Sequence, residues 1–315
     1  MDPLLRLRRL HGLWVGARGR LTRPPGRRQP GNGPGPEPGR GGAGGAASPA
    51  PAGGGGIAVR VRLRFGKLGK LRWTSHRDLA RMWERALRRA RLPVVYTGGF
   101  SPRPKLSFGL ALPTGAESTC EYLDVELDQP DVDVEGLPGL LTPALPAGVD
   151  VLVAGGLEER APSLQQEVTS CQWELEVTGW GPPELERAVG TVLQRSSLTV
   201  TRERKGHAVT DDIRPAILHL AVGVPSAAAG EPGPPPAPPA EEGEATPGPA
   251  PVLLRAELAT QPRGLRPAEL LCALGPGLEE VRVRRTHQWI ERDGARWEPL
   301  PLGATDAPRA LERVS

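Results

Sequence analysis

Residues 57–65 read Ile57-Ala58-Val59-Arg60-Val61-Arg62-Leu63-Arg64-Phe65, in which apolar residues alternate with small or basic ones. A two-residue period of this kind is typical of a strand with one buried face and one open face. We therefore expect ordered structure to begin here. The predicted strand carries Arg60, Arg62 and Arg64 on its open face.

A helix is predicted to follow, from Ser75 to about Leu92. Ser75-His76-Arg77-Asp78 resembles a capping box, in which the serine hydroxyl takes a free backbone N–H of the first turn. Pro93 stops the helix because it cannot continue the backbone hydrogen bonds. One apolar stripe at three- and four-residue spacing is formed by Leu79, Met82, Trp83, Ala86, Leu87 and Ala90. The opposite side carries Arg77, Arg81, Arg85 and Arg88.

The rest of the N-terminal half continues the alternation of strands and helices. A short helix is predicted at 134–141. Strands are predicted at 93–96, 106–110, 121–127 and 149–153. The resulting strand-helix-strand-strand-helix-strand order is ferredoxin-like.

The same order can be traced again after Ser170, although the strands outnumber the simple pattern. Helices are expected at 183–194 and 266–274. Strands are expected at 171–177, 198–202, 217–222, 252–259 and 281–290. We therefore predict an α+β fold of two tandem ferredoxin-like domains, 57–160 and 161–315. A tail, 1–56, and an insertion, 224–250, are rich in Pro, Gly and Ala and are predicted to be disordered.

Charge is distributed unevenly along the chain. The net charge of the 315 residues is +4. Residues 57–110 nevertheless contain fourteen Lys or Arg against only Asp78 and Glu84, whereas residues 111–315 are net acidic. A basic surface carried on regular elements is the usual footprint of a protein that meets phosphates or another polyanion.

The cysteines and the hydropathy exclude several classes of protein. Cys120, Cys171 and Cys272 are isolated and lack the spacing of a zinc or iron–sulfur site. No apolar run approaches the length of a membrane span, and the N-terminus lacks the features of a secretory signal. We expect a cytoplasmic protein with no metal, no cofactor and no membrane association.

Several stretches occur in a fixed order along the chain. They are Arg72-Trp73-Thr74-Ser75-His76-Arg77-Asp78-Leu79, Glu84-Arg85-Ala86-Leu87-Arg88-Arg89-Ala90, Gly99-Phe100-Ser101-Pro102-Arg103-Pro104-Lys105-Leu106-Ser107-Phe108 and Glu121-Tyr122-Leu123-Asp124-Val125. Together with residues 161–164, 210–215 and 266–271, they resemble the radical-SAM-linked (radical-SAM-associated) protein family. That domain of unknown function occurs alone or fused behind a radical-SAM domain. The resemblance implies a radical-SAM enzyme as a partner, since this chain lacks the cysteine triplet that holds such an enzyme's cluster.

The residues expected to contact a polyanion lie between positions 72 and 105. Arg offers a planar fork of N–H groups that suits phosphate oxygens. The basic candidates, which converge if the Pro-rich loop 99–105 folds back over the helix, are Arg72, Arg81, Arg85, Arg88, Arg89, Arg103 and Lys105. Phe100 is the expected base-stacking residue, whereas Tyr96 and Phe108 are assigned to the core. Ser75 and His76 lie at the helix N-terminus, where free N–H groups favour an anion.

Three functions are compatible with these patterns. The leading hypothesis is an RNA-binding or substrate-presenting accessory protein that works with a radical-SAM enzyme. The alternatives are a protein-interaction module that docks on such an enzyme, and an RNA-processing enzyme that uses His76. No complete catalytic or cluster-binding motif is present, which favours a non-enzymatic role.

Overall fold

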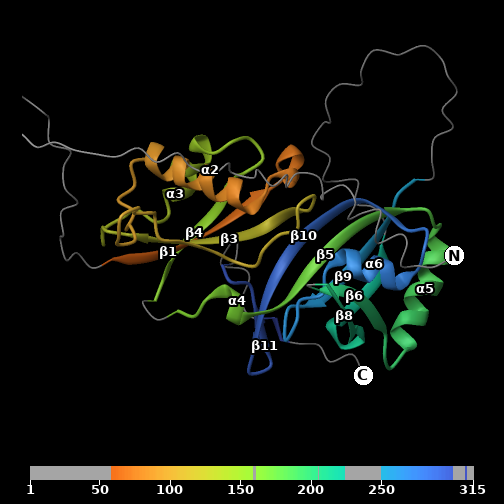
Figure 1. Ribbon diagram of the computed structural model, residues 1–315. Coiled ribbons are helices and arrows are strands. Elements are labelled where there is room, and N and C mark those ends of the chain that lie inside the picture. Colours follow the sequence, from red (N-terminus) through yellow and green to blue (C-terminus); the bar gives the residue numbers. More distant parts are fainter. Residues whose placement is uncertain (1–57, 159–160, 205, 224–249, 301–308, 311–315) are drawn as a thin grey trace, which may run out of the picture. The chain divides into compact units, whose positions relative to one another are not determined.

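The described residues of the computed structural model are 58–158, 161–204, 206–223, 250–300 and 309–310 (Figure 1). The predicted disordered tail and nearly all of the predicted disordered insertion lie outside them. The described strands build one ten-stranded mixed sheet, whose main path is β4-β1-β3-β10-β5-β9-β8, and a separate two-stranded sheet. The predicted α+β class is confirmed.

The N-terminal half of the large sheet contains β1 (Val59–Lys67), β2 (Leu106–Phe108), β3 (Glu117–Leu127) and β4 (Val151–Leu157). β1 pairs antiparallel with β3 and β4, and β2 pairs antiparallel with β3. The predicted strand at 93–96 is reduced to isolated bridges at Val94 and Tyr96. Since side chains alternate along a strand, Val61, Leu63 and Phe65 share one face.

Two helices, α2 (His76–Arg89) and α3 (Leu137–Leu141), cover this apolar face of the sheet (Figure 1). Short 3₁₀ turns, η1 (Gly69–Trp73) and η2 (Thr142–Ala144), lead into α2 and out of α3. Trp83 of α2 is fully buried and meets the ring of Phe65 edge-on, with centroids 5.0 Å apart. This contact fixes which side of α2 faces the sheet and leaves the arginine side in solvent.

The other face of β1 is not open, and the prediction for Arg62 and Arg64 was wrong. Both side chains are buried. Arg62 Nε donates to Asp124 Oδ1 at 2.8 Å, and Arg64 Nη1 donates to Glu298 Oε2 at 2.5 Å. Arg60 is partly buried and donates to Asp124 and to the backbone of Ala161. A guanidinium can be buried when a carboxylate neutralises it, and here β3 and the segment after β11 supply those carboxylates.

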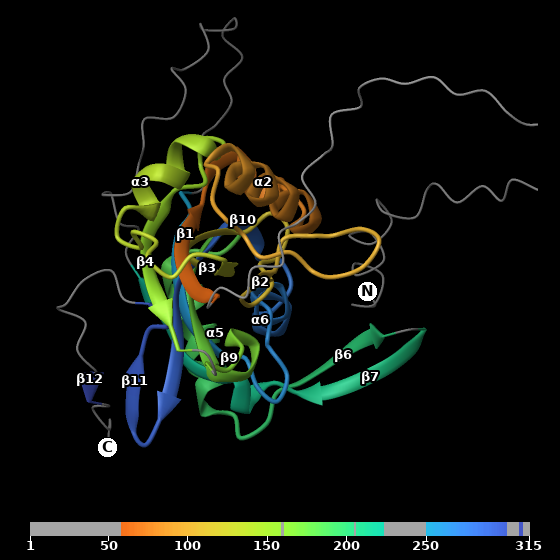
Figure 2. The same ribbon diagram turned by 90° about the vertical axis from the view of Figure 1, so that its left-hand side faces the viewer.

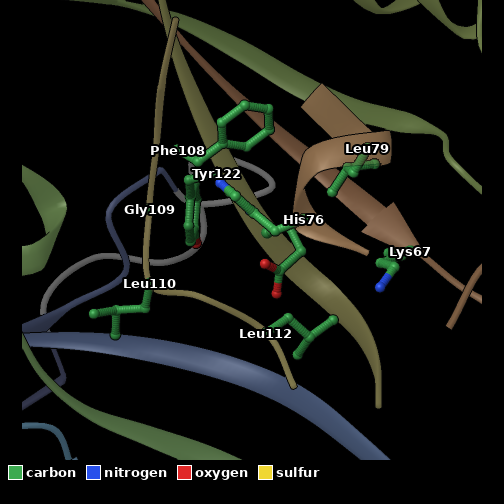
Figure 3. A pocket seen from close by; sticks show the side chains of 9 residues that line it. Lys67, His76, Leu79, Phe108, Gly109, Leu110, Leu112 and Tyr122 are labelled. Carbon is green, nitrogen blue, oxygen red and sulfur yellow. The ribbon is translucent and has the colours of Figure 1, made fainter. Parts of the chain in front are cut away.

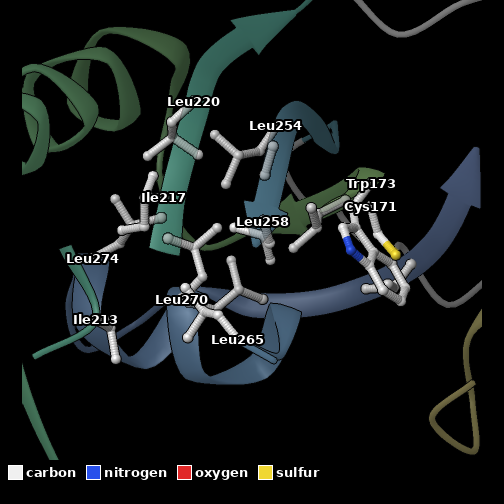
Figure 4. Close-up of a cluster of buried hydrophobic side chains, with 14 of the residues drawn as sticks. Cys171, Trp173, Ile213, Ile217, Leu220, Leu254, Leu258, Leu265, Leu270 and Leu274 are labelled. Atoms are coloured by element: carbon white, nitrogen blue, oxygen red, sulfur yellow. The ribbon is translucent and has the colours of Figure 1, made fainter. Parts of the chain in front are cut away.

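The C-terminal half contains β5 (Val168–Thr178), β8 (Ile217–Gly223), β9 (Val252–Ala259) and β10 (Glu279–Arg292), extended by β11 (Ala295–Trp297) and β12 (Arg309–Ala310). Its helices are α4 (Leu164–Glu167), α5 (Pro182–Gln194) and α6 (Pro267–Leu274). Figure 4 shows Leu270 and Leu274 of α6 packed toward the leucines of β8 and β9. This is a second hydrophobic core.

A hairpin of β6 (Thr199–Arg204) and β7 (His207–Asp212) projects from the C-terminal half (Figure 2). β7 was missed, because its polar alternation resembles a loop. Asp211 at the end of this hairpin pairs with Arg202 and Arg263, while Arg214, at the start of η3 (Arg214–Ala216), donates to backbone carbonyls.

The two halves of the sheet are joined by a parallel pairing of β3 with β10. Glu117 lies opposite Arg284, and Ser118 lies opposite Arg285. The described residues belong to one compact unit. The finer expectations, two tandem ferredoxin-like domains with a boundary near residue 160, stay predictions.

Candidate functional site

The start of α2 is capped as the sequence predicted. The Ser75 hydroxyl accepts a hydrogen bond from the Asp78 backbone N–H at 3.2 Å and donates to Asp78 Oδ2 at 2.7 Å. The cap satisfies one of the free N–H groups of the first turn and fixes the direction in which the helix leaves the sheet.

The end of α2 comes three residues earlier than the predicted stop near Leu92. Arg91 adopts a left-handed backbone conformation, with φ 56°. The Arg91 N–H bonds to the Arg88 carbonyl at 3.1 Å, and the Leu92 N–H bonds to the Leu87 carbonyl at 3.2 Å. These two bonds form a Schellman motif, which closes a helix before any proline is needed.

The outer face of α2 is a row of exposed arginines, Arg77, Arg81, Arg85 and Arg88. Residues three and four apart are neighbours on a helix, so the row runs about 16 Å along the axis at 1.5 Å per residue. Arg85 Nε donates to the Arg81 carbonyl and Arg88 Nε donates to the Glu84 carbonyl, both at 3.1 Å. These bonds orient the two guanidiniums but leave their Nη groups available to a ligand.

Carboxylates neutralise this row only weakly. The Arg81–Asp78 pair is 3.5 Å long and the Arg88–Glu84 pair is 3.9 Å long, and both are at the surface. Within the described residues, Arg77 and Arg85 have no carboxylate partner. Exposed pairs of this kind contribute about 1 kcal/mol or less, so a stronger anion can displace them.

Five arginines of the sheet region are bound much more closely. Their carboxylate partners lie at distances of 2.5–3.1 Å. The pairs are Arg62 with Asp124, Arg64 with Glu298, Arg284 with Glu117, Arg285 with Glu121 and Arg296 with Glu257. The contrast separates structural arginines in the sheet from arginines on α2 that are free to meet a ligand.

Three of the predicted basic residues are already engaged. Arg89 Nη1 donates to the Ala144 carbonyl at 2.8 Å, and Lys105 Nζ donates to Glu126 Oε2 at 2.8 Å. The Arg72 guanidinium lies 5.2 Å from the ring centre of Trp73. Burial raises the pKa of Glu280, and the positive charge of Arg72 acts in the opposite direction. Arg72, Arg89 and Lys105 therefore have structural contacts besides any role at a surface.

The loop between α2 and β2 folds back on itself as a hairpin (Figure 2). The Thr97 N–H donates to the Arg103 carbonyl at 2.8 Å, and the Arg103 N–H donates to Thr97 Oγ1 at 3.1 Å. Phe100, near its tip, is fully exposed, and Arg103 is exposed beside it. Tyr96 was assigned to the core but is exposed.

This hairpin does not fold back over α2 as the convergence of the seven basic residues required. The Val95 N–H and the Lys105 side chain bond to Glu126, at the edge of β3. Between residues 97–105 and 76–89, the described structure contains no hydrogen bond or ion pair. The chain therefore presents two separate basic elements, the outer face of α2 and the hairpin with Phe100.

A pocket lies at the N-terminal end of α2. Figure 3 shows His76 and Leu79 of α2 on one side, with Phe108 and Gly109 on the other. It is lined by Lys67, His76, Leu79, Phe108, Gly109, Leu110, Leu112, Glu121 and Tyr122. The His76 and Phe108 rings meet edge-on, with centroids 4.9 Å apart. Phe108 was assigned to the core but is only partly buried.

The charged groups of this pocket are almost completely buried. Lys67 Nζ donates to the carbonyls of Arg72 at 3.3 Å and Thr74 at 3.1 Å. Burial lowers the pKa of Lys67, and Arg285 lowers it further, while the charge of Glu121 acts in the opposite direction. Lys67 is therefore less strongly held in its charged form than an ordinary surface lysine.

Glu121 is held by a buried, two-pronged ion pair with Arg285. Arg285 Nη2 lies 2.6 Å from Glu121 Oε1 and 2.8 Å from Oε2, and it also donates to the Leu110 carbonyl at 2.8 Å. Burial alone would lower the pKa of Arg285, but Glu121 raises it above its ordinary value. The pair fixes both the carboxylate and the loop that forms one wall of the pocket.

Sequence reasoning missed Lys67 and Arg285, and one signal for Lys67 was available. Lys67 follows Phe65 by two positions, so the strand period places it on the apolar face, where a lysine is uncommon. Arg285 gave no comparable signal, because its partner Glu121 is 164 residues away. Glu121 and Asp124 are three positions apart on β3, so they point to opposite faces, and they bind different arginines, Arg285 and Arg62.

In the described residues, no group of three or more His, Cys, Asp or Glu side chains is placed to hold a metal ion. No described helix is long and apolar enough to cross a membrane.

Comparisons with known proteins give one family match. The sequence model of a family described as "Uncharacterized protein conserved in bacteria (DUF2344)" matches residues 60–232, more than half of the chain. No curated protein matches. A similar solved structure is a chain of a Cbf5-Nop10-Gar1 complex, at 12% identity and a TM-score of 0.35. The alignment covers 72% of this chain and 48% of that chain, about half of its length. At that TM-score the likeness carries no argument about fold or function.

Proposed function

The chain belongs to the DUF2344 family of uncharacterised proteins conserved in bacteria, and we propose that it is a cytoplasmic, non-catalytic accessory protein that binds single-stranded RNA. In this proposal the RNA backbone follows the outer face of α2, and the protein presents the RNA to a radical-SAM enzyme. The scaffold is a pair of ferredoxin-like halves. The observation that carries the proposal is the row of weakly paired arginines at 77, 81, 85 and 88.

The geometry of this row suits a phosphate chain. Arginines on adjacent helical turns follow one line on the helix surface, and each guanidinium offers forked N–H donors to phosphate oxygens. The free N–H groups at the start of α2, beside Ser75 and His76, add a further place for an anion. A strand that lies along α2 would therefore meet donors over its whole length.

Phe100 supplies a second kind of contact. An exposed aromatic ring is a platform on which an unpaired base can stack whatever its sequence. Arg103 lies three residues away on the same hairpin and is exposed. We assign stacking to Phe100 and backbone contact to Arg103, so that the hairpin binds the part of the RNA that extends beyond α2.

The first test is salt-dependent binding of a 12-nucleotide oligouridine, measured by fluorescence anisotropy. Four phosphate contacts give a slope of about −2.8 when the logarithm of the association constant is plotted against the logarithm of the salt concentration. The affinity should therefore fall about 50-fold between about 50 and about 200 mM salt. Arg85→Glu with Arg88→Glu should remove about half of the slope. The control is Arg187→Glu with Arg195→Glu, the same change of charge at exposed positions of α5 and its C-terminal end.

Two outcomes would overturn the proposal. One is the absence of salt-sensitive binding by the wild-type protein. The other is an equal loss in the α2 variant and the α5 variant, since binding would then follow net charge rather than a surface. Co-purification with a radical-SAM enzyme that survives nuclease would instead favour direct docking of the basic face on an acidic protein surface.

A second candidate function is RNA processing, favoured by the pocket that brings His76 near Lys67 and Glu121. A histidine beside a lysine of lowered pKa is a possible acid–base pair. His76 is exposed, so His76→Ala should leave the fold intact. If cleavage of bound RNA is detected and His76→Ala does not reduce it, this candidate is excluded.

A further inference from the structure

We propose that Trp73, just before α2, is a stacking platform for one unpaired base of the RNA. This inference rests on the proposed function, because the arginine row of α2 would bring the strand to the tryptophan. It adds a base contact at the end of α2 where the surface otherwise meets phosphates. Along the chain Trp73 is followed by the N-cap, Ser75, and by the first arginine of the row, Arg77.

Trp73 is the only exposed tryptophan among the described residues, and 64% of its surface is open to solvent. The Arg72 guanidinium lies over the ring, 5.2 Å from its centre. An indole covered on both faces could not leave most of its surface accessible, so at least one face is free for a ligand. Single exposed apolar side chains are common on proteins. Trp73 differs from them in the way it is held and in the charge around it.

Buried charged residues fix the turn that carries Trp73. Lys67 Nζ donates to the Arg72 carbonyl at 3.3 Å and to the Thr74 carbonyl at 3.1 Å, on either side of Trp73. Glu117 Oε1 accepts the backbone N–H of the first residue of η1 at 3.0 Å. Both charged side chains are more than nine-tenths buried. Burial of a charge is unfavourable unless its polar atoms are bonded, so these bonds give the turn a defined shape.

Gly115, just before β3, makes room for the ring of Trp73. Its backbone is left-handed, with φ 95°, and its N–H donates to the Arg72 carbonyl at 2.8 Å. A Cβ at this position would lie 3.0 Å from the nearest atom of the indole. The ring therefore has its place before any ligand binds, and a base that stacks on it loses little free energy to ordering of the protein.

The surroundings of Trp73 are basic. Lys70 and Arg77 are exposed close to it along the chain, and Arg72 lies over the ring. A base that stacks on Trp73 brings its own phosphate to these cations and to the free N–H groups at the start of α2. An apolar peptide would use the ring but gain nothing from the cations. A polyanion with flat rings uses both, which favours single-stranded RNA as the ligand.

Trp73 and the hairpin with Phe100 lie at opposite ends of β3. Gly115, which contacts Trp73, comes just before the first residue of β3, whereas the hairpin bonds to Glu126, next to its last residue. In sequence, too, Trp73 precedes α2 and the hairpin follows it. The 14 residues of α2 span about 20 Å. A strand that follows the arginine row would therefore have an aromatic platform near each end.

The experiment measures binding of the 12-nucleotide oligouridine over a range of salt concentrations. Trp73→Ala should weaken binding about tenfold, through the loss of one stacked base. The slope against salt should keep its wild-type value, because stacking releases no counterions. Leu218→Ala is the matched control. It removes an apolar side chain of β8 that is 52% exposed, and it should bind as the wild type does.

Two further variants separate stacking from a simple apolar contact. Trp73→Phe keeps an aromatic face and should bind within about threefold of the wild type, whereas Trp73→Leu should bind as weakly as Trp73→Ala. RNA binding should also quench the tryptophan fluorescence of the wild type. That quench should be largely lost in Trp73→Phe, because Trp73 is the only exposed tryptophan of the described residues.

The outcomes separate this inference from the proposed function. If the wild type shows no salt-sensitive binding of oligouridine, both fail. If it binds with the expected salt dependence but Trp73→Ala stays within about twofold of it, only the platform fails, and the exposed ring is then a contact for a protein. Equal affinities of Trp73→Leu and Trp73→Phe, or a full quench in Trp73→Phe, also overturn stacking. These two variants decide the matter if Trp73→Ala lacks a cooperative thermal transition.

Discussion

Replacing Arg285 by Met should destabilise the protein severely, because it leaves the Glu121 carboxylate buried without a counter-charge. Arg285 is fully buried, makes three N–H contacts to Glu121 within 3.1 Å and lies over the ring of Trp173 at 5.4 Å. Removal of one partner from a buried pair costs about 3–5 kcal/mol. The Leu110 carbonyl also loses its donor, at about 1–3 kcal/mol if it stays buried.

A double-mutant cycle separates these contributions. Adding Glu121→Leu to Arg285→Met removes the buried, unpaired carboxylate. Only the lost hydrogen bond to the Leu110 carbonyl and any packing defect should then remain, which together cost about 1–3 kcal/mol. The double variant should therefore be about 3–5 kcal/mol more stable than Arg285→Met alone, and the coupling free energy between the two positions should be at least about 3 kcal/mol. The pair joins β3 to β10, so the loss should appear as weaker attachment of the two halves of the sheet.

The assay is urea unfolding followed by circular dichroism. The dependence of the unfolding free energy on urea concentration should be the same for each variant, which confirms that they unfold in the same way. Arg255→Met is the matched control, since Arg255 pairs with Glu174 at 3.4 Å and is half exposed. Its loss should cost about 1 kcal/mol or less. The reasoning is refuted if Arg285→Met costs no more than Arg255→Met, or if the double variant costs as much as the two single variants together.

Three further predictions address the helix end, the hairpin and the buried lysine. Arg91→Gly should stabilise the protein by about 1 kcal/mol, measured by urea unfolding, because glycine adopts the left-handed conformation at φ 56° without strain; an unchanged midpoint would contradict this. Phe100→Ala should weaken oligouridine binding by about 1–3 kcal/mol in anisotropy assays with an unchanged thermal midpoint, because the ring is fully exposed; equal affinity would exclude stacking. The pKa of Lys67 is lowered in the folded protein, so the unfolded chain binds more protons between that lowered pKa and the ordinary value of 10.5. The stability of the wild type relative to Lys67→Met should therefore rise with pH across that window, and a constant or falling difference in unfolding free energy would show that the pKa of Lys67 is not lowered.

The elements around the candidate site were predictable because their signals are local. The alternation over 57–65 predicted β1, and Ser75 with Asp78 predicted the start of α2 within one residue. The apolar stripe that contains Trp83 predicted which side of α2 is buried, and so also predicted the exposed arginines. Each of these inferences depends on residues within one or two turns of one another, which the backbone period alone brings together.

The sequence was less informative wherever a side chain depends on a distant partner. Arg62 and Arg64 occupy alternate positions of a strand that normally face solvent. Their side chains are buried instead, because Asp124 and Glu298 neutralise them in the interior. The hairpin that carries Phe100 is tied to the edge of β3 rather than to α2, because its backbone bonds to Glu126.

The sequence by itself therefore determined that a basic helix face exists and where it lies on the chain. Only the tertiary structure decided which charges are free and which are structural, and it alone brought Lys67 and Glu121 to one pocket and paired Glu121 with Arg285. The physical reason is the cost of burying a charge. A guanidinium or an ammonium enters the interior only where a carboxylate or carbonyls meet it. Here those partners lie up to 234 residues away, beyond the reach of any local pattern.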